Sequence, residues 1–180
     1  MTQQEEIRLF EKTSQITLVM ATEQGNIEDG IQIATDIEES LKSLDGKIRK
    51  SAEMSLYYHL ASFWLVAKNP SEGLKWANKF LNEPKSELHM DYQSMARVVN
   101  IILHFELGHW DLLEYAIKSA YRFIYKHERL FKFESLILRT IKRLTESSGD
   151  NNRAEILKQA KTELVEVLKD PYEIRSSYLF

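Results

Sequence analysis

Apolar residues recur at helical spacing along almost the whole 180-residue chain, and this periodicity constrains the fold more than any other feature. The alternation of apolar and polar residues that half-buried strands require is nearly absent. The periodic runs are interrupted at glycine, asparagine and proline, the residues that most often end or begin helices. The chain is therefore expected to be all-α, with about eight or nine helices.

The positions of these interruptions give the expected helix boundaries. Pro70 fits the first turn of a helix, because the N–H that proline lacks has no partner there. Neighbouring helices should run antiparallel, because the connections between them are short. We expect helices over residues 4–23, 27–44, 47–68, 71–81, 88–107, 110–126, 130–146 and 152–168, and a short segment from 170 onward.

Some of the expected helix pairs carry bulky and small residues at fixed spacing. Residues 57–64 read Y-x2-L-A-x2-W, and residues 73–84 continue with G-x3-A-x2-F and a proline. Bulky side chains fill the groove between paired helices, and small ones let the two helix axes approach each other. Residues 106–116 (ELGHWDLLEYA) form the turn of a second such pair, and residues 24–30 (QGNIEDG) that of a third.

This pattern resembles the tetratricopeptide repeat, W-x2-L-G-x2-Y followed by A-x3-F and P over about 34 residues. The resemblance implies a right-handed α-α hairpin superhelix. It implies one domain over residues 1–180, with units at about 4–44, 47–84 and 88–126 and a C-terminal helical cap over 130–180. The turns lie further apart than in the family. Residues 106–134 also resemble a helical module of bacterial proteins, which implies no particular activity. A generic helical bundle is the alternative fold.

The resemblance also implies where a ligand would bind, because the first helix of each tetratricopeptide pair lines a concave surface. The function it implies is a non-catalytic protein–protein interaction module that binds a peptide or a partner helix. Two readings of this surface stay open. It is either free for a partner, or covered by the chain's own last helices or by a second copy, since large exposed apolar patches are unusual in monomers. The residues expected there are Tyr58, Ser62, Leu65, Met95, Val98, Ile102 and Phe105.

A basic stretch is the alternative site. Residues 118–143 hold eight basic and two acidic side chains, a net charge of +6, although the whole chain has a net charge of −3. The alternative function is a homodimeric regulatory bundle that binds an acidic ligand or nucleic acid through this face. Its residues are Lys118, Arg122, Lys126, Arg139 and Lys142.

Two observations weigh against nucleic acid. The isoelectric point of the chain is about 6.0. Tyr121, Phe123 and Tyr125 lie at spacing typical of core residues, so we do not expect them to form exposed platforms on which bases stack.

The sequence shows no recognisable catalytic or metal-binding motif. His104-x-Glu106-x2-His109 places its histidines five residues apart across the Gly108 turn, whereas zinc-binding helices present histidines four apart. There is no phosphate-binding glycine-rich loop and no Gly-x-Ser-x-Gly nucleophile motif. We therefore expect no enzyme activity, no metal and no cofactor. A helical enzyme whose acid pair forms only in three dimensions is the third reading.

Composition indicates where the chain works. It contains no cysteine, which leaves no disulfides or thiolate metal ligands. Residues 1–12 (MTQQEEIRLFEK) lack the apolar centre of a secretory signal, and no run approaches the roughly 18 apolar residues of a membrane span. We expect a cytoplasmic protein with a protein or peptide partner, with a homodimer as the alternative.

Overall fold

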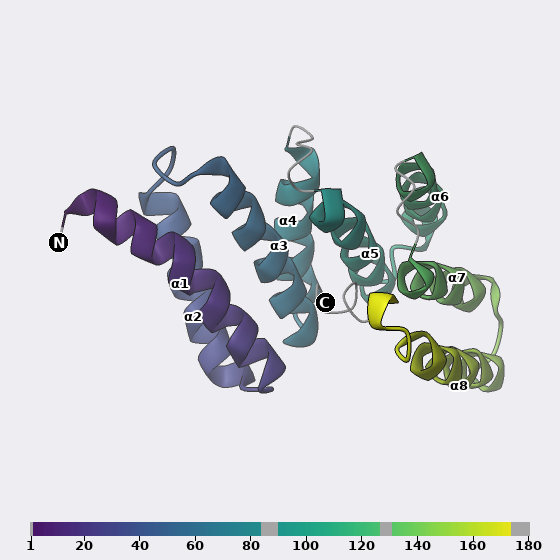
Figure 1. The fold of residues 1–180 in the computed structure, drawn as a ribbon. Coiled ribbons are helices and arrows are strands. Elements are labelled where there is room, and N and C mark those ends of the chain that lie inside the picture. Colours follow the sequence, from purple (N-terminus) through teal and green to yellow (C-terminus); the bar gives the residue numbers. More distant parts are fainter. Residues whose placement is uncertain (1, 84–89, 127–130, 174–180) are drawn as a thin grey trace. The chain divides into compact units, whose positions relative to one another are not determined.

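The computed structural model of the chain describes residues 2–83, 90–126 and 131–173, without the side chains of residues 90 and 91 (Figure 1). All regular secondary structure in these residues is helical, which confirms the all-α prediction. Pro84, residues 88 and 89, residue 130 and the last residues of the chain, which the sequence analysis used, lie outside the described residues. The helices are α1 (Gln3–Glu23), α2 (Ile27–Ser43), α3 (Lys50–Val66), α4 (Pro70–Asn82), α5 (Met90–Glu106), α6 (Trp110–Lys126), α7 (Lys132–Glu146) and α8 (Asp150–Val167).

The chain divides into two compact units, Met1–Met90 and Asp91–Phe180, called unit 1 and unit 2 below. Unit 1 contains α1 to α4, and unit 2 contains α6 to α8 and all of α5 after its first residue. The single domain and the superhelix expected from the sequence stay predictions.

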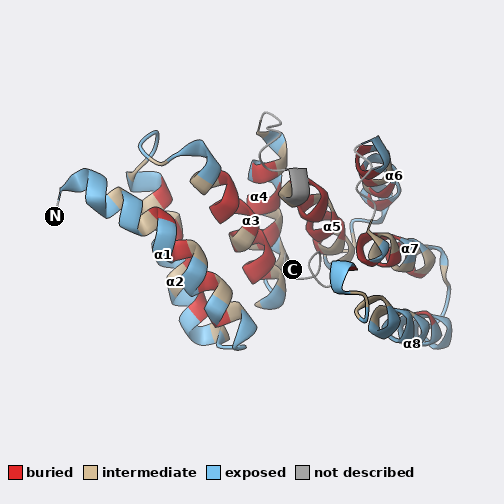
Figure 2. Cartoon of the chain, viewed as in Figure 1, coloured by how far each residue is buried: buried red, intermediate tan, exposed pale blue. Residues whose placement is uncertain are grey.

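Helix α3 occupies the centre of unit 1. It packs against α1, α2 and α4, and α1 also packs against α2. Because α3 has neighbours on several sides, every residue from Met54 to Trp64 except His59 is buried (Figure 2). A helix buried on all sides needs apolar residues around its whole circumference, which explains the run of large side chains in this segment.

Helices α2 and α3 approach each other closely at Gly30. A Cβ atom added to this glycine would lie 2.4 Å from Cε2 of Phe63, whose ring is fully buried. The glycine therefore gives the Phe63 ring room to pack between the two helices, the role that a small residue has in paired helices.

A partly buried carboxylate group connects α2, α3 and α4. Trp64 of α3 and Trp76 of α4 both donate their indole N–H groups to Oε1 of Glu38 on α2, each at 3.0 Å. Nζ of Lys79 lies 4.2 Å from the centre of the Trp76 ring. A hydrogen bond to a charged acceptor is stronger than one between neutral groups, so these contacts help to hold the three helices together.

Three inter-helix turns share one hydrogen-bond pattern. The second residue after each helix end has a positive φ, at Gly25 (68°), Lys68 (59°) and Gly108 (68°). In each turn the N–H of the next residue donates to a carbonyl five residues earlier, at 2.9 to 3.0 Å, and the N–H of the positive-φ residue donates to a carbonyl three residues earlier. This is the Schellman ending, which satisfies the last carbonyls of a helix. The Asn69-Pro70 start of α4 is also as expected, with the Asn69 side chain capping the helix.

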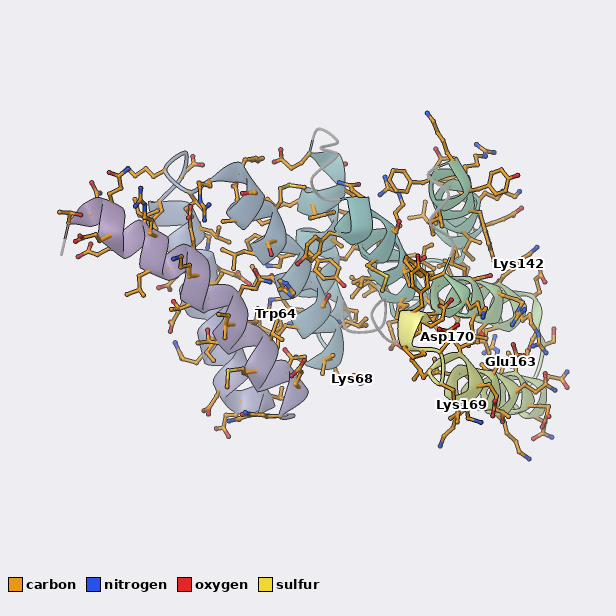
Figure 3. All side chains as sticks on the ribbon, in the orientation of Figure 1. Trp64, Lys68, Lys142, Glu163, Lys169 and Asp170 are labelled. Carbon is orange, nitrogen blue, oxygen red and sulfur yellow. The ribbon has the colours of Figure 1, made fainter. Side chains whose placement is uncertain are left out.

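In unit 2, α6 packs against α7, and α7 against α8. The guanidinium group of Arg97 on α5 lies 3.7 Å from the centre of the Phe123 ring on α6. Arg139 of α7 forms an ion pair with Glu163 of α8. Figure 3 labels Glu163, and also Lys142 of α7.

The segment after α8 folds back onto the start of α7. The N–H of Phe133 donates to Oε2 of the buried Glu173 at 3.1 Å, and Nζ of Lys132 lies 3.5 Å from Oδ2 of Asp170. These contacts supply a remote cap for the first turn of α7, where main-chain N–H groups lack partners within the helix.

The largest difference from an expected helix start is at α3, which begins at Lys50 and not at residue 47, because Gly46 has φ +71° and the turn continues to Arg49. α7 begins at Lys132 and α8 at Asp150, each two residues from the expected start. Among the helices of the described residues, none combines the length and the apolar character needed to cross a membrane.

Candidate partner-binding surfaces

The expected groove residues of unit 1 belong largely to its core. Tyr58 has no exposed surface, and its ring centre lies 6.2 Å from that of Phe80 on α4. Ser62 is buried, and Leu65 is partly exposed. The expectation that Tyr58 and Ser62 face a partner is wrong for this structure, because α3 is surrounded by the other helices of its unit.

The same correction applies to α5 in unit 2. Met95 and Val98 have no exposed surface, and Ile102 and Phe105 are only partly exposed. The Phe105 ring packs edge-on against Trp110 at the start of α6, with ring centres 5.5 Å apart. Met95 and Val98 are therefore buried in the chain itself and do not face a partner.

Helix α1 carries three exposed apolar side chains that were not among the expected site residues. Leu9, Ile16 and Met20 are 50%, 58% and 50% exposed. Together with the exposed Thr13 they repeat at intervals of four, three and four residues, which places all four on one side of the helix. We call these four residues the α1 seam. The opposite side of α1, with Leu18 and other buried residues, packs into unit 1.

A sequence signal for the α1 seam was present. Apolar residues lie on both sides of α1, with Leu18 and Ala21 on one side and Ile16 and Met20 on the other. A surface helix of an isolated domain usually has one apolar side only, so a second apolar side predicts a further contact.

Most of the expected basic face is paired with acidic side chains. Nζ of Lys118 lies 2.5 Å from Glu114, Nζ of Lys142 lies 3.8 Å from Glu146, and Arg139 pairs with Glu163. The five residues are all exposed, as expected. The pairing reduces the positive potential, so this face is weaker as an anion-binding surface than the sequence charge suggests.

The exposed side of α6 nevertheless differs from the prediction in its aromatic residues. Tyr125 was expected in the core but is 81% exposed, and Tyr115 is 74% exposed. Phe123 is buried as expected. Within the described part of the chain, Arg122 and Lys126 form no ion pair, so two tyrosines and two unpaired cations occupy the exposed side of one helix.

The titratable side chains His59 and Tyr57 of α3 form part of the packed interior of unit 1. Burial lowers the pKa of His59 to about 4, which keeps this imidazole neutral at pH 7. Burial and the hydrogen bond to Glu53 raise the pKa of Tyr57 well above its usual range. No group of three or more metal-ligating side chains converges within the described ranges.

Comparisons of the chain with protein-family models, with curated proteins and with solved structures return no match.

Proposed function

We propose that the chain is a non-catalytic protein–protein interaction module of tetratricopeptide type, and that a partner helix binds to the α1 seam. The observation that carries this proposal is the half-exposed row of Leu9, Ile16 and Met20 on a helix whose other side belongs to the core of unit 1.

The repeat character is supported by the three turns with the same Schellman geometry, at positions 25, 68 and 108. The close approach at Gly30 joins the second helix of the first pair to the first helix of the next, as stacking of successive pairs requires.

The spacing of the α1 seam favours a helical partner. Side chains at alternating intervals of three and four residues form the ridge into which the side chains of a second helix insert. An extended strand would instead need a sheet edge or a row of pockets.

The energy available from the α1 seam indicates the strength of binding. Full burial of a large aliphatic side chain contributes about 1.5–3 kcal/mol, so burying the exposed half of three such side chains contributes roughly 3 kcal/mol in total. Micromolar affinity corresponds to about 8 kcal/mol. The partner must therefore also make contacts outside the α1 seam, and we expect weak, reversible binding.

A capture experiment tests this function. The chain, immobilised, is exposed to native lysate beside the variant Ile16→Lys with Met20→Lys. The matched control is Thr35→Lys with Glu39→Lys, which changes two exposed α2 residues at the same spacing. We expect one protein set to be retained by the wild type and the control and lost from the seam variant. Equal retention by all three chains would contradict the proposal.

The exposed side of α6 supports a second candidate, an acidic ligand bound by Arg122 and Lys126 with Tyr115 and Tyr125 beside them. Its test is the fluorescence anisotropy of a labelled poly-glutamate peptide and of a labelled single-stranded oligonucleotide. Binding that weakens with salt and is lost in Arg122→Glu with Lys126→Glu would support this candidate. No binding at low salt would exclude both ligands.

A further inference from the structure

The turn between α5 and α6 brings two histidines face to face. His104 lies in the last turn of α5, and His109 precedes the first residue of α6. The N–H of His109 donates to the carbonyl of His104 at 3.0 Å, and Gly108 takes the positive φ that reverses the chain. As a result, the two Nδ1 atoms lie 2.9 Å apart, with ring centres separated by 5.2 Å.

This contact holds two imidazole lone pairs in a position to share one small cation. In neutral imidazole one ring nitrogen carries a proton and the other accepts a hydrogen bond, so the contact between the Nδ1 atoms holds a single proton. When both rings carry their protons on Nε2, both Nδ1 lone pairs are free. A rotation of each ring about χ2, a broad torsion in histidine, then directs both lone pairs to a common ion.

The geometry of the pair suits a transition-metal ion. Bonds from a metal to histidine nitrogen are about 2.0–2.1 Å long, so two nitrogens on one ion lie about 2.9 Å apart at the 90° angle of tetragonal Cu²⁺ or Ni²⁺ and roughly 3.3 Å apart at a tetrahedral angle. The Nδ1 atoms lie 2.9 Å apart in the hydrogen-bonded pair, and the ring rotation that frees both lone pairs adjusts this distance. The general order of affinities also places Cu²⁺ above Ni²⁺ and Zn²⁺.

We propose that His104 and His109 form a two-imidazole site for a divalent copper or nickel ion at the α5–α6 turn. With no third ligand among the described residues, water would occupy the remaining positions. The five-residue spacing of the pair does not fit one helix, so no metal site was expected here. The Gly108 turn, and not a helix, brings the rings together.

The surroundings of the pair suit this role. His104 is partly exposed at the end of α5. His109 is exposed, which leaves the pair open to solvent. Trp110 follows directly in sequence and packs on Phe105, so an ion held here would link the end of α5 to the start of α6.

The test is calorimetric titration of the full chain with CuCl2, NiCl2 and ZnCl2 at pH 7.4, with electron paramagnetic resonance of the copper form. We expect one copper ion per chain with two nitrogen ligands, and affinities in the order copper, nickel, zinc. His104→Asn and His109→Asn should each weaken copper binding at least tenfold while circular dichroism stays unchanged. A bound ion should also raise the thermal midpoint of the wild type.

The control is His89→Asn with His127→Asn, which removes two histidines outside the pair. It should bind copper as the wild type does. Three results would overturn the proposal: no copper binding, several weak sites only, or single His104 and His109 variants that bind as tightly as the wild type. If His104→Asn disturbs the turn, His109→Asn decides the question, because His109 is exposed.

Discussion

The carboxylate of Glu11 accepts hydrogen bonds from both the main-chain N–H and the Nε of Arg49, each at 2.7 Å. This links α1 to the residue that precedes α3, which has no side-chain cap of its own. The two partners differ in environment, since the Glu11 side chain is 2% exposed and that of Arg49 is 68% exposed. The buried carboxylate therefore depends on Arg49 and its N–H for its hydrogen bonds.

Replacing Glu11 by alanine should lower the free energy of unfolding by about 1–3 kcal/mol, because the Arg49 N–H loses its acceptor in a partly buried position. Urea unfolding followed by circular dichroism measures this. Lys12→Ala, at an exposed position of the same helix, is the matched control and should change the value by no more than about 0.5 kcal/mol. Equal effects of the two variants would show that the Glu11–Arg49 contact adds nothing.

Lys68→Gly should stabilise the protein. Lys68, labelled in Figure 3, has φ 59°, where Gly25 and Gly108 stand in the equivalent turns. A residue with a Cβ in this conformation costs roughly 1 kcal/mol, so the glycine variant should gain up to about 1 kcal/mol in urea unfolding. Ala67→Gly, one residue earlier with a negative φ, should instead lose stability. A loss in both variants would contradict this assignment of the turn.

Gly30→Ala should destabilise unit 1, although alanine is the better helix former. The added Cβ would meet the Phe63 ring at 2.4 Å, and overpacking of this kind costs typically about 1–3 kcal/mol. In a chain that already carries Phe63→Leu, Gly30→Ala should cost less stability than it does in the wild type, because the smaller side chain leaves space for the added Cβ. A double variant whose two effects simply add would place the two residues out of contact.

Stability should fall with acid in a way that depends on His59. Burial lowers its pKa from 6.5 to about 4 in the folded chain, so between these values the unfolded chain binds the additional proton. The part of the free energy of unfolding that depends on neutral His59 is fully present above about pH 6.5 and is lost as the pH falls toward 4. The loss reaches about 3 kcal/mol, at some 1.4 kcal/mol per pH unit. Urea unfolding at several pH values should show a shallower slope over this range for His59→Leu. An unchanged slope would assign the acid sensitivity to other groups.

The helix order followed from the sequence because helix ends have local causes. Asn69-Pro70 and the glycines at 25 and 108 mark ends that the structure confirms, since capping and positive φ depend on a few neighbouring residues. The exposure of individual side chains could not be predicted from the sequence in the same way. Tyr58 and Tyr125 both lie at helical spacing, yet one is fully buried and the other 81% exposed, because burial depends on how many helices surround each position.

The candidate sites also depend on which side of each helix its neighbours cover. The expected groove required α3 and α5 to keep one side open, which their spacing could not establish. The α1 seam required only that apolar residues occur on both sides of one helix, and this was readable in the sequence. The His104–His109 contact depends on the direction of the chain after Gly108, which spacing along a helix does not give.

The central claim is that the α1 seam binds a partner helix, and site-specific photo-crosslinking tests it most directly. A photoreactive phenylalanine derivative is placed at Ile16, in the α1 seam, and separately at the exposed Thr35 on α2. We expect one discrete adduct from Ile16 in native lysate, with little or none from Thr35, and its mass separates a second copy from another protein. An adduct from Ile16 no stronger than that from Thr35 would show that the α1 seam binds no partner.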